Sequence, residues 1–427
     1  MNISTQARQN KGRQAKKVAV FVSLANAYGR EVLQGITQYA KENGPWRIHL
    51  DYEFSRWQFP PWLRHWRGDG IISRISSEEM YDFSRKTGIP VIDLNERVPS
   101  LGLPLLYNDQ VAVGRMAAEH LLERDYSEFG YIGQQGYLWS DERCRGFCDR
   151  IRESGGTCSV FKGLRFDDRI VDNRFEYRNS TWERERPRIQ AWIRALPKPV
   201  GILACNSFRA IQLLEEAEAV HLSVPEVVAI ISGDNEEIAC EMVSPTISGV
   251  ILNSKEIGYR AAELLARAMN GEELGHYERY IPPLGIAVRT STQVYKVAHP
   301  VIQQALEFIR ENARYDISVP DVAACVDLST TKLQRLFRVE LNKTVLEQIL
   351  NEKIEIAKIL LRTTNLSIEE IAIKSGFNHP QRLSEAFVRK TGIRPGKFRK
   401  QPHLVPESDV APPHKEKRTH LDSKDAG

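Results

Sequence analysis

The chain has 427 residues, 42% of them hydrophobic, and a formal net charge of +4. This length allows two or three ordinary domains, each with a substantial core. No stretch reaches the roughly 20 apolar residues that span a membrane, and the small net charge gives no general attraction to nucleic acid. We therefore expect a cytoplasmic protein without a membrane partner, in which any contact with nucleic acid comes from a local basic surface.

The two ends of the chain lack the periodicity of folded elements. Residues 1–16 are polar and basic, and residues 401–427 combine prolines with alternating charges, so we expect both segments to be disordered. Lys16-Lys17, the apolar run 18–24 and Ala25-Asn26-Ala27 imitate a signal peptide, but the run is at the lower length limit for export. It also fits a buried parallel strand followed by a helix, which is the interpretation that we favour.

Between residues 17 and 285, short β-branched runs alternate with helical patterns. The expected strands cover residues 18–24, 70–75, 90–94, 129–133, 200–205, 227–232 and 247–252. The expected helices cover residues 30–42, 112–124, 141–153, 186–195, 209–219 and 254–269. Strands separated by helices indicate parallel βαβ units. The span is too long for one sheet, so we expect two similar lobes. The first ends near Arg124 and the second runs from Phe129 to about Pro245, after which the chain returns to the first.

Polar residues follow most of the expected strands. In folds of this kind, ligands bind outside the carboxyl ends of the strands, in the crevice between the lobes. Amide and carboxylate groups bond vicinal hydroxyls and aromatic rings cover C–H faces, so this crevice suits a polyhydroxylated ligand. Asn and Asp after a strand also cap helices and turns, and that alternative stays open. The strand-end residues are Ala25-Asn26-Ala27-Tyr28, Asn95, Asn108-Asp109, Gln134-Gln135, Asn206-Ser207, Asp234-Asn235 and Asn253.

The sequence gives no indication of catalysis or of a bound metal. It has no Gly-rich phosphate loop, nucleophile elbow or paired acid–base set. The six cysteines lack metal-ligand spacing, although Cys144 and Cys148 can share a helix face, and we interpret all six as buried free thiols in a reducing compartment. We expect a protein that is not an enzyme and that has no cofactor.

The last hundred residues contain one pattern twice. In each copy, a short helix with Ala at its packing point is followed by a tight turn and by a second helix that is apolar on one face. This is the pattern of a helix-turn-helix, and two of them in tandem indicate a domain that binds double-stranded DNA. The two copies are marked by Val322-Ala323, Asp327-Leu328, Leu333 and Phe337, and by Ile371-Ala372, Gly376-Phe377 and Phe387.

The second helix of each copy is expected to contact DNA. Ser329 is the expected N-cap of the first such helix, and the second is expected to start at Asn378 or His379, with Pro380 in its first turn. From Lys374 to Lys400 the chain has eight Lys or Arg and one acid, Glu385, which gives the local basic surface that DNA contact requires. Each outward residue can contact a phosphate or a base edge. These residues are Thr330, Thr331, Lys332, Gln334, Arg335 and Arg338 in the first helix and His379, Gln381, Arg382, Glu385 and Arg389 in the second. Between the copies, residues 345–361 form an apolar helix that is expected to hold the two units at a fixed separation.

The chain from about residue 17 to 400 resembles the xylose operon regulators, a branch of the AraC/XylS regulators with a LacI-type sensor. The AraC-type signature is carried by Ala372, Gly376-Phe377, Leu383, Phe387, Gly392, Pro395 and Phe398-Arg399, with Asp327 at a turn position that is usually Gly. In the sensor part, the resemblance rests on Ala27-Tyr28-Gly29-Arg30, Asn108-Asp109, Glu119-His120-Leu121, Arg143-x-x-Gly146-Phe147, Cys205-Asn206 and Gly233-Asp234-Asn235-Glu236. Ser207 stands where those regulators have Asp.

The resemblance implies an α/β two-lobed periplasmic-binding-protein-like (LacI-type) sensor domain at 17–285. A linker at 286–298 and an all-α AraC-type domain with two helix-turn-helix motifs at 299–400 would follow. It implies a sugar-responsive transcription activator in which a small sugar, D-xylose or another pentose or hexose, closes the lobes and repositions the DNA-binding domains of a homodimer. Operator DNA and RNA polymerase are the expected macromolecular partners. The residues expected to contact the sugar are Tyr28, Arg30, Asp109, Trp139, Arg143, Asn206 and Asp234.

Two alternatives stay open from the sequence. In the first, the chain is a solute-binding or enzymatic α/β protein with an unrelated helical tail. In the second, it is a regulator whose sensor domain binds no small ligand and serves only for dimerisation. Sugar binding together with salt-dependent DNA binding would separate the favoured hypothesis from both.

Overall fold

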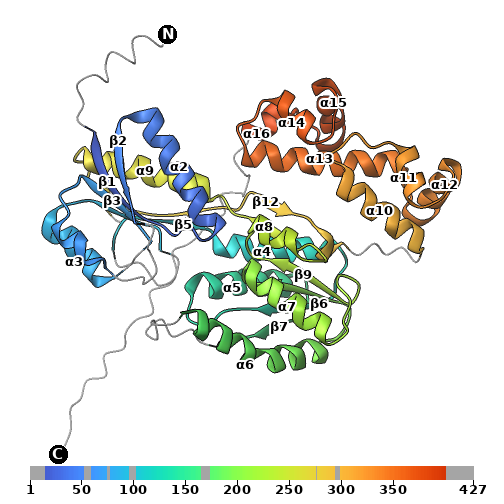
Figure 1. Ribbon diagram of the computed structural model, residues 1–427, viewed down its shortest axis with the longest axis horizontal. Coiled ribbons are helices and arrows are strands. Elements are labelled where there is room, and N and C mark those ends of the chain that lie inside the picture. Colours follow the sequence, from blue (N-terminus) through green and yellow to red (C-terminus); the bar gives the residue numbers. More distant parts are fainter. Residues whose placement is uncertain are drawn as a thin grey trace, which may run out of the picture.

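The structure, a computed structural model, describes residues 15–51, 59–74, 77–95, 102–164, 174–275, 277–293 and 299–400. For residues 174–181, Pro300 and Thr363, only the backbone is described. The segments expected to be disordered lie outside these residues, except for Ala15 and Lys16, and Lys16 begins the first strand. Most of the chain forms two α/β lobes, and a helical domain follows them (Figure 1).

The first lobe is built on a parallel sheet of six strands in the order β11-β5-β4-β3-β1-β2. Side chains alternate along a strand, so β1 contributes to two cores. Val18 and Val20 pack with α2 and α9, whereas Ala19 and Phe21 pack with η1 and α3. The strands are β1 (Lys16–Phe21), β2 (Trp46–Leu50), β3 (Gly70–Ser73), β4 (Val91–Asp93), β5 (Leu105–Asn108) and β11 (Glu278–Ile281). The helices are α2 (Ala27–Asn43), η1 (Pro61–His65), α3 (Glu78–Thr87) and α9 (Ser254–Met269).

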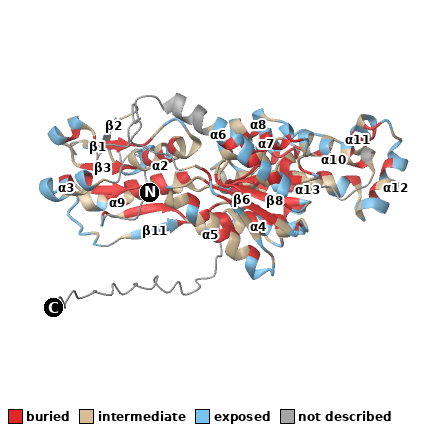
Figure 2. Cartoon of the chain, turned by 90° about the horizontal axis from the view of Figure 1, so that it is seen from below, coloured by how far each residue is buried: buried red, intermediate tan, exposed pale blue. Residues whose placement is uncertain are grey.

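The second lobe repeats this design, with the strand order β12-β10-β9-β8-β6-β7 and with β12 as the antiparallel edge. Leu203 and Ile231 face α4 and α5, and Ile202 and Ile230 face α6 and α7, so both faces of the sheet are buried (Figure 2). The strands are β6 (Glu128–Ile132), β7 (Cys158–Phe161), β8 (Val200–Ala204), β9 (Val228–Ser232), β10 (Ser248–Ile251) and β12 (Gly285–Ala287). The helices are α4 (Gln110–Leu122), α5 (Leu138–Glu153), α6 (Arg174–Ala195), α7 (Ser207–Ala219) and α8 (Glu237–Met242).

The boundary between the lobes differs from the expected one. We expected the first lobe to end near Arg124, but α4 packs in the second lobe, where Ala117 and Leu121 join the core of Phe147. The chain therefore crosses to the second lobe directly after β5. It returns after β10 to form α9 and β11, and crosses a third time between β11 and β12.

The sensor also extends beyond residue 285, where we expected it to end. Strand β12 pairs with β10, and the short helix η2 (Thr290–Thr292) is bonded to the same sheet. The Ser291 hydroxyl donates to the Ile230 carbonyl at 2.5 Å, and the Nε2 atom of His120 lies 2.9 Å from the Thr292 hydroxyl. Residues 294–298 of the expected linker lie outside the described residues.

Several strands and helices of the sensor were missing from the expectation, and the position of a strand at a sheet edge explains two of them. Strands β2, β5, β7, β11 and β12 and helices α3 and α8 were not expected. Strand β2 alternates between half-buried and exposed positions, and β11 is exposed along its first three residues, because both lie at sheet edges. An edge strand carries few apolar residues and therefore gives little hydrophobic signal.

The helical domain has two cores that share one long helix. Leu333 and Phe337 belong to the first core, Leu383 and Phe387 to the second, and α13 contributes buried residues to both. The helices are α10 (Pro300–Asn312), α11 (Val319–Cys325), α12 (Thr330–Leu341), α13 (Val345–Thr363), α14 (Ile368–Lys374), α15 (Pro380–Thr391) and α16 (Pro395–Lys400). In the described part of the chain, no helix has both the length and the apolar character that crossing a membrane requires.

The two helix-turn-helix units contain the tight turns that their sequences predict. Asp327, with φ of 52°, lies between α11 and α12, and Gly376, with φ of 79°, follows α14. A Cβ atom on Gly376 would lie 2.2 Å from the carbonyl oxygen of Ala313, so only glycine fits there. Asp327 adopts the same left-handed region at some steric cost.

Candidate effector cleft and DNA-binding surface

A pocket opens between the lobes at the carboxyl ends of their strands. The first lobe contributes the start of α2, and the second lobe contributes the loop after β9 and the end of β10. Of the residues expected to contact a sugar, Tyr28 and Asp234 line this pocket directly. The described lining residues are Asn26, Ala27, Tyr28, Glu31, Asp234, Asn235, Glu236, Ile251, Leu252 and Ser254.

Arg143 lies deep in the second lobe with a fixed guanidinium. Its side chain, 3% exposed, donates from Nε to Gln110 Oε1 at 2.6 Å and from Nη1 to the carbonyl oxygen of Cys205. Its guanidinium carbon lies 5.1 Å from the centre of the Trp139 ring. Gly233 leaves room for it, because a Cβ atom there would lie 3.1 Å from Nη1. The expected residues Arg143 and Trp139 are therefore neighbours, at the strand ends of the lobe.

Asp234 is held by a cluster of hydroxyls. Its Oδ1 atom accepts hydrogen bonds from the Ser207 amide at 2.8 Å, the Ser207 hydroxyl at 2.5 Å and the Ser232 hydroxyl at 3.2 Å. Ser207 is fully buried, and its hydroxyl also accepts from the Glu236 amide at 3.1 Å. Ser207 thus orients the carboxylate of Asp234.

Asn206 and Asp109 have the capping role that we left open for them. The Asn206 side chain accepts from the Arg209 amide at 2.9 Å at the start of α7, and the Asp109 side chain accepts from the Ala112 amide at 2.8 Å at the start of α4. A capping oxygen satisfies one of the free amides of the first helical turn. Both residues lie at strand ends, but neither is among the described residues that line the pocket.

The two lobes are joined across the pocket by Glu236. Its carboxylate forms an ion pair with Arg30 and accepts a hydrogen bond from the Ala27 amide at 2.5 Å. Ala27 is the first residue of α2, where free amides favour a negative charge. Arg30, expected to bind the sugar, is therefore engaged by the opposite lobe in this structure.

The sequence analysis missed one acidic residue that lines the pocket, Glu31, and one residue that lies against a lining residue, Arg74. Arg74 is 9% exposed and lies 4.2 Å from the centre of the Tyr28 ring, and Glu31 lines the pocket. Burial raises the pKa of Glu31, and the charge of Glu236 adds to this effect. Arg74 directly follows β3, but the strand was expected to run to residue 75, so the rule that selected the other strand-end residues passed over it. Glu31 lies inside a helix and gave no such signal.

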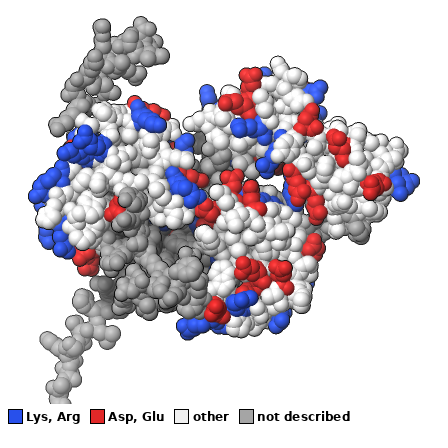
Figure 3. Space-filling model, in the orientation of Figure 1, with Lys and Arg blue, Asp and Glu red and all other residues white. Residues whose placement is uncertain are grey.

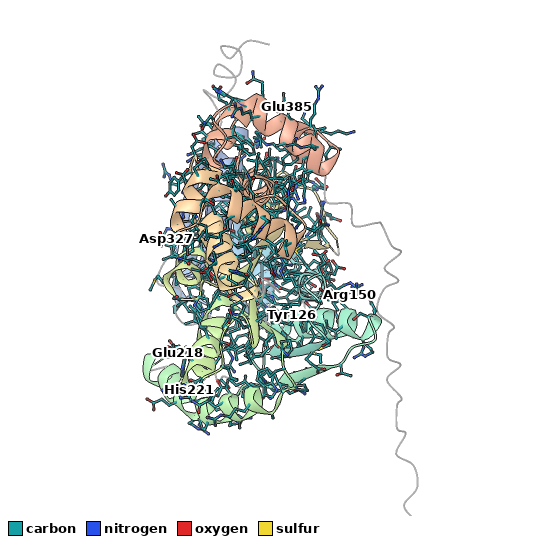
Figure 4. The ribbon with its side chains drawn as sticks, turned by 90° about the vertical axis from the view of Figure 1, so that its right-hand side faces the viewer. Tyr126, Arg150, Glu218, His221, Asp327 and Glu385 are labelled. Carbon is teal, nitrogen blue, oxygen red and sulfur yellow. The ribbon has the colours of Figure 1, made fainter. Side chains whose placement is uncertain are left out.

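The residues expected to contact DNA form two exposed surfaces. Every one of them on α12 and α15 is exposed, while Leu333, Phe337, Leu383 and Phe387 on the same helices are buried. Ser329 caps α12 by accepting from the Lys332 amide at 3.3 Å, as predicted, and Pro380 begins α15 after His379. Asp327 and Glu385 mark the two units in Figure 4, well apart from Glu218 and His221 at the far end of the second lobe. The visible face of the helical domain in Figure 3 carries charges of both signs.

Among the described residues, two arginines of the helical domain form hydrogen bonds to the sensor. Arg362 on α13 donates to the carbonyl oxygen of Leu284 at 2.7 Å, in the segment where the chain crosses from β11 to β12. Arg310 on α10 donates to the Thr290 hydroxyl at 3.1 Å and to the Gln293 side chain. One contact thus lies on a connection between the lobes and the other on the segment that leads out of the sensor.

Within the described residues, no group of three or more His, Cys, Asp or Glu side chains is arranged to hold a metal ion. All six cysteines are free, and only Cys205 and Cys240 are buried. The expectation that all six are buried is therefore wrong for the other four, which are partly exposed.

Comparisons with known proteins match the same division of the chain. Residues 17–98 match the family described as XylR N-terminal domain, residues 118–292 the Periplasmic binding protein-like domain, and residues 322–401 a Helix-turn-helix domain. The Xylose operon regulatory protein of Haemophilus influenzae is 29% identical over 391 residues, which cover 90% of this chain and 98% of that protein. Its counterpart in Escherichia coli K12 is 28% identical over 395 residues, which cover 90% of this chain and 96% of that protein.

A solved structure shows the same arrangement. The structure of the xylose-binding transcription activator xylR is 26% identical, has a TM-score of 0.57 and matches 90% of this chain and 98% of its own. Both lobes and the helical domain are thus covered by one alignment. The chain is homologous to the xylose operon regulatory proteins over nearly its whole length, with a periplasmic-binding-protein-like domain followed by an AraC-type helix-turn-helix domain.

Proposed function

We propose that the protein is a transcription regulator that binds operator DNA under the control of a neutral sugar, with D-xylose as the first candidate. The observation that carries this proposal is the joining, in one chain, of an interlobe pocket and two exposed helix-turn-helix surfaces. The relatives that match both parts are named as xylose operon regulators, and the matching solved structure as a xylose-binding activator.

The charges of the pocket support a neutral effector. Its described lining includes the carboxyl groups of Glu31, Asp234 and Glu236. Two arginines lie beside the lining without being part of it: Arg30 is paired with Glu236, and Arg74 lies against the Tyr28 ring. A sugar acid or sugar phosphate would bring a further negative charge next to these groups, which costs free energy in a site shielded from water. The hydroxyls of a neutral sugar can donate to the same carboxylates. Aldopentoses and hexoses are therefore favoured over their acids.

The sugar acts by stabilising the closed arrangement of the lobes. A ligand shifts a conformational equilibrium only through its different affinity for the two states, and one that contacts both lobes binds the closed state better. Arg362 contacts the connection between β11 and β12, so a change of lobe angle reaches the DNA-binding domain directly. The protein acts as a homodimer in the cytoplasm and recruits RNA polymerase; these points rest on the resemblance to AraC-type activators. It has no catalytic activity.

The test measures thermal unfolding of the full chain with D-xylose, other pentoses, hexoses and sugar acids. A sugar at about 100 times its Kd stabilises the folded protein by about 2.7 kcal/mol, which gives a visible shift of the melting temperature. The variant Arg143→Ala should lose this shift and keep salt-dependent binding to DNA. Arg145→Ala is the matched control, because Arg145 is a largely exposed arginine on the same helix.

Three outcomes would contradict the proposal. A shift with sugar acids but not with neutral sugars would refute the argument from the pocket charges. Turnover of a sugar would point to an enzyme. If no sugar in the panel shifts the melting temperature while DNA binding is intact, the protein would be a regulator whose sensor domain binds none of these sugars.

A further inference from the structure

Three of the four partly exposed cysteines lie together on the second lobe. Cys144 and Cys148 are one turn apart on α5, with their sulfur atoms 3.9 Å apart. Cys158 begins the neighbouring edge strand β7, and all three cysteines pack against the same core of the second lobe. None of the three lines the pocket between the lobes, and no step of the proposed function uses them.

The cluster favours a thiolate at Cys148. Hydrogen bonds from the Cys144 and Cys158 thiols lower the pKa of Cys148, and the positive charge of Arg152 lowers it further. The same contacts raise the pKa values of Cys144 and Cys158, which therefore remain protonated donors. The thiolate is the nucleophilic form of cysteine, so Cys148 is the reactive member of the cluster.

Helix geometry excludes one of the two neighbours of Cys148 as its disulfide partner. A disulfide needs Cβ atoms about 3.5–4.5 Å apart. Residues four apart on a helix have Cβ atoms about 5–6 Å apart, so a bond between Cys144 and Cys148 would distort α5. Cys158 is on a strand and is free of this constraint. Cys148 and Cys158 are both partly exposed, so small oxidants can reach them.

We propose that Cys148 and Cys158 form a reversible disulfide when the protein meets hydrogen peroxide or another hydroperoxide. The Cys148 thiolate attacks one peroxide oxygen, the O–O bond breaks, and water leaves after taking up a proton, which gives a sulfenic acid. The Cys158 sulfur then attacks the Cys148 sulfur, and a second water leaves. Two thiols lose two electrons and two protons, and hydrogen peroxide is reduced to two waters. Cys144 supplies a hydrogen bond that holds the thiolate and is not consumed.

The disulfide would act on the helix that forms the sensor site. Helix α5 carries Arg143 and Trp139 at its cleft end and the two cysteines further along. Gly146 packs closely on α4, since a Cβ atom there would lie 2.1 Å from the carbonyl oxygen of Val111. A covalent bond from α5 to β7 therefore constrains a helix that has no room to adjust. The bond itself does not depend on the identity of the effector.

The test uses the full reduced chain, treated with hydrogen peroxide and analysed by peptide mapping. We expect loss of two free thiols, a crosslink between the peptides that contain Cys148 and Cys158, and full reversal by dithiothreitol. Cys148→Ser and Cys158→Ser should each abolish the crosslink. Cys144→Ala should keep the crosslink but slow its formation by roughly tenfold, because the thiolate loses a donor. Cys325→Ser, which removes a partly exposed cysteine of α11 outside the cluster, should change nothing.

A crosslink between Cys144 and Cys148 would overturn the assignment of the partner. Oxidation of Cys148 to a sulfinic acid without a crosslink, or a reaction no faster than that of Cys325, would overturn the proposal as a whole. The thermal shift with D-xylose, measured on the oxidised and on the reduced protein, tests the link to the sensor. We expect a smaller shift after oxidation. Because mapping reads the crosslink without any sugar, a failure of the sugar hypothesis cannot be mistaken for a failure of this one.

Discussion

The ion pair between Arg30 and Glu236 gives a sharp test of lobe closure. In the variant Glu236→Gln, the side chain keeps its size and can still accept from the Ala27 amide, but the charge that binds Arg30 is lost. The side chain of Glu236 is 13% exposed and that of Arg30 is 41% exposed. Charged hydrogen bonds contribute about 1.5–3 kcal/mol when buried and exposed pairs about 0–1 kcal/mol, so we take about 1 kcal/mol for this half-exposed pair.

This loss should appear in the affinity for sugar. If the sugar binds the closed state, destabilising that state by about 1 kcal/mol weakens the apparent affinity for D-xylose by up to fivefold or so. Isothermal titration calorimetry measures this directly. Glu237→Gln is the matched control, because Glu237 is the next residue and is exposed. An unchanged Kd, or a tighter one, for Glu236→Gln would refute the reasoning: the ion pair would then be neutral for closure or would compete with the sugar for Arg30.

Three further predictions concern DNA binding and stability. Arg382→Ala should weaken binding to the specific operator by about 1–3 kcal/mol if Arg382 contacts a base. Fluorescence anisotropy measures this binding, and random DNA is the control. An equal loss of affinity for random DNA would show that Arg382 contacts a phosphate instead. Asp327→Gly should stabilise the helical domain by about 0.5 kcal/mol in urea unfolding, because glycine relieves the left-handed strain but adds freedom to the unfolded chain. In the same assay, Gly376→Ala should destabilise the domain by at least about 2 kcal/mol, because its Cβ atom would clash with the Ala313 carbonyl oxygen. Burial lowers the pKa of His120 well below its ordinary value, so the unfolded chain binds a proton that the folded protein does not. The free energy of unfolding should therefore be highest above about pH 6.5 and fall by up to ~1.4 kcal/mol per pH unit below it. His120→Gln should reduce this dependence.

The sequence predicted best where the local pattern and the tertiary environment agree. Strands β8 and β9 are buried at every position, and their continuous apolar runs were recognised. The helix-turn-helix units were recognised for a related reason: their turns need particular residues at Asp327 and Gly376, and their helices place apolar residues on one face. Edge strands such as β2 and β11 were missed because their side chains remain partly in water.

The candidate site was predictable only in part. Strand-end position selected Asp234 and Tyr28 correctly as pocket-lining residues, because the carboxyl ends of parallel strands meet at one edge of each lobe. The same position selected Asn206 and Asp109, whose side chains cap helices, since a helix often begins where a strand has just ended. Strand ends alone do not distinguish these two roles.

By itself, the sequence determined the order of the domains, the α/β character of the sensor and the positions of the two helix-turn-helix units, because these follow from periodicities and turn residues within a few neighbouring positions. Tertiary structure decided where one lobe ends, since the apolar face of α4 could have packed on either sheet. It also decided the contacts of Glu236 with Ala27 and Arg30, which lie 209 and 206 positions away in sequence, and the grouping of Cys158 with two cysteines of another element. Such contacts depend on how whole elements pack, and no short-range pattern records them.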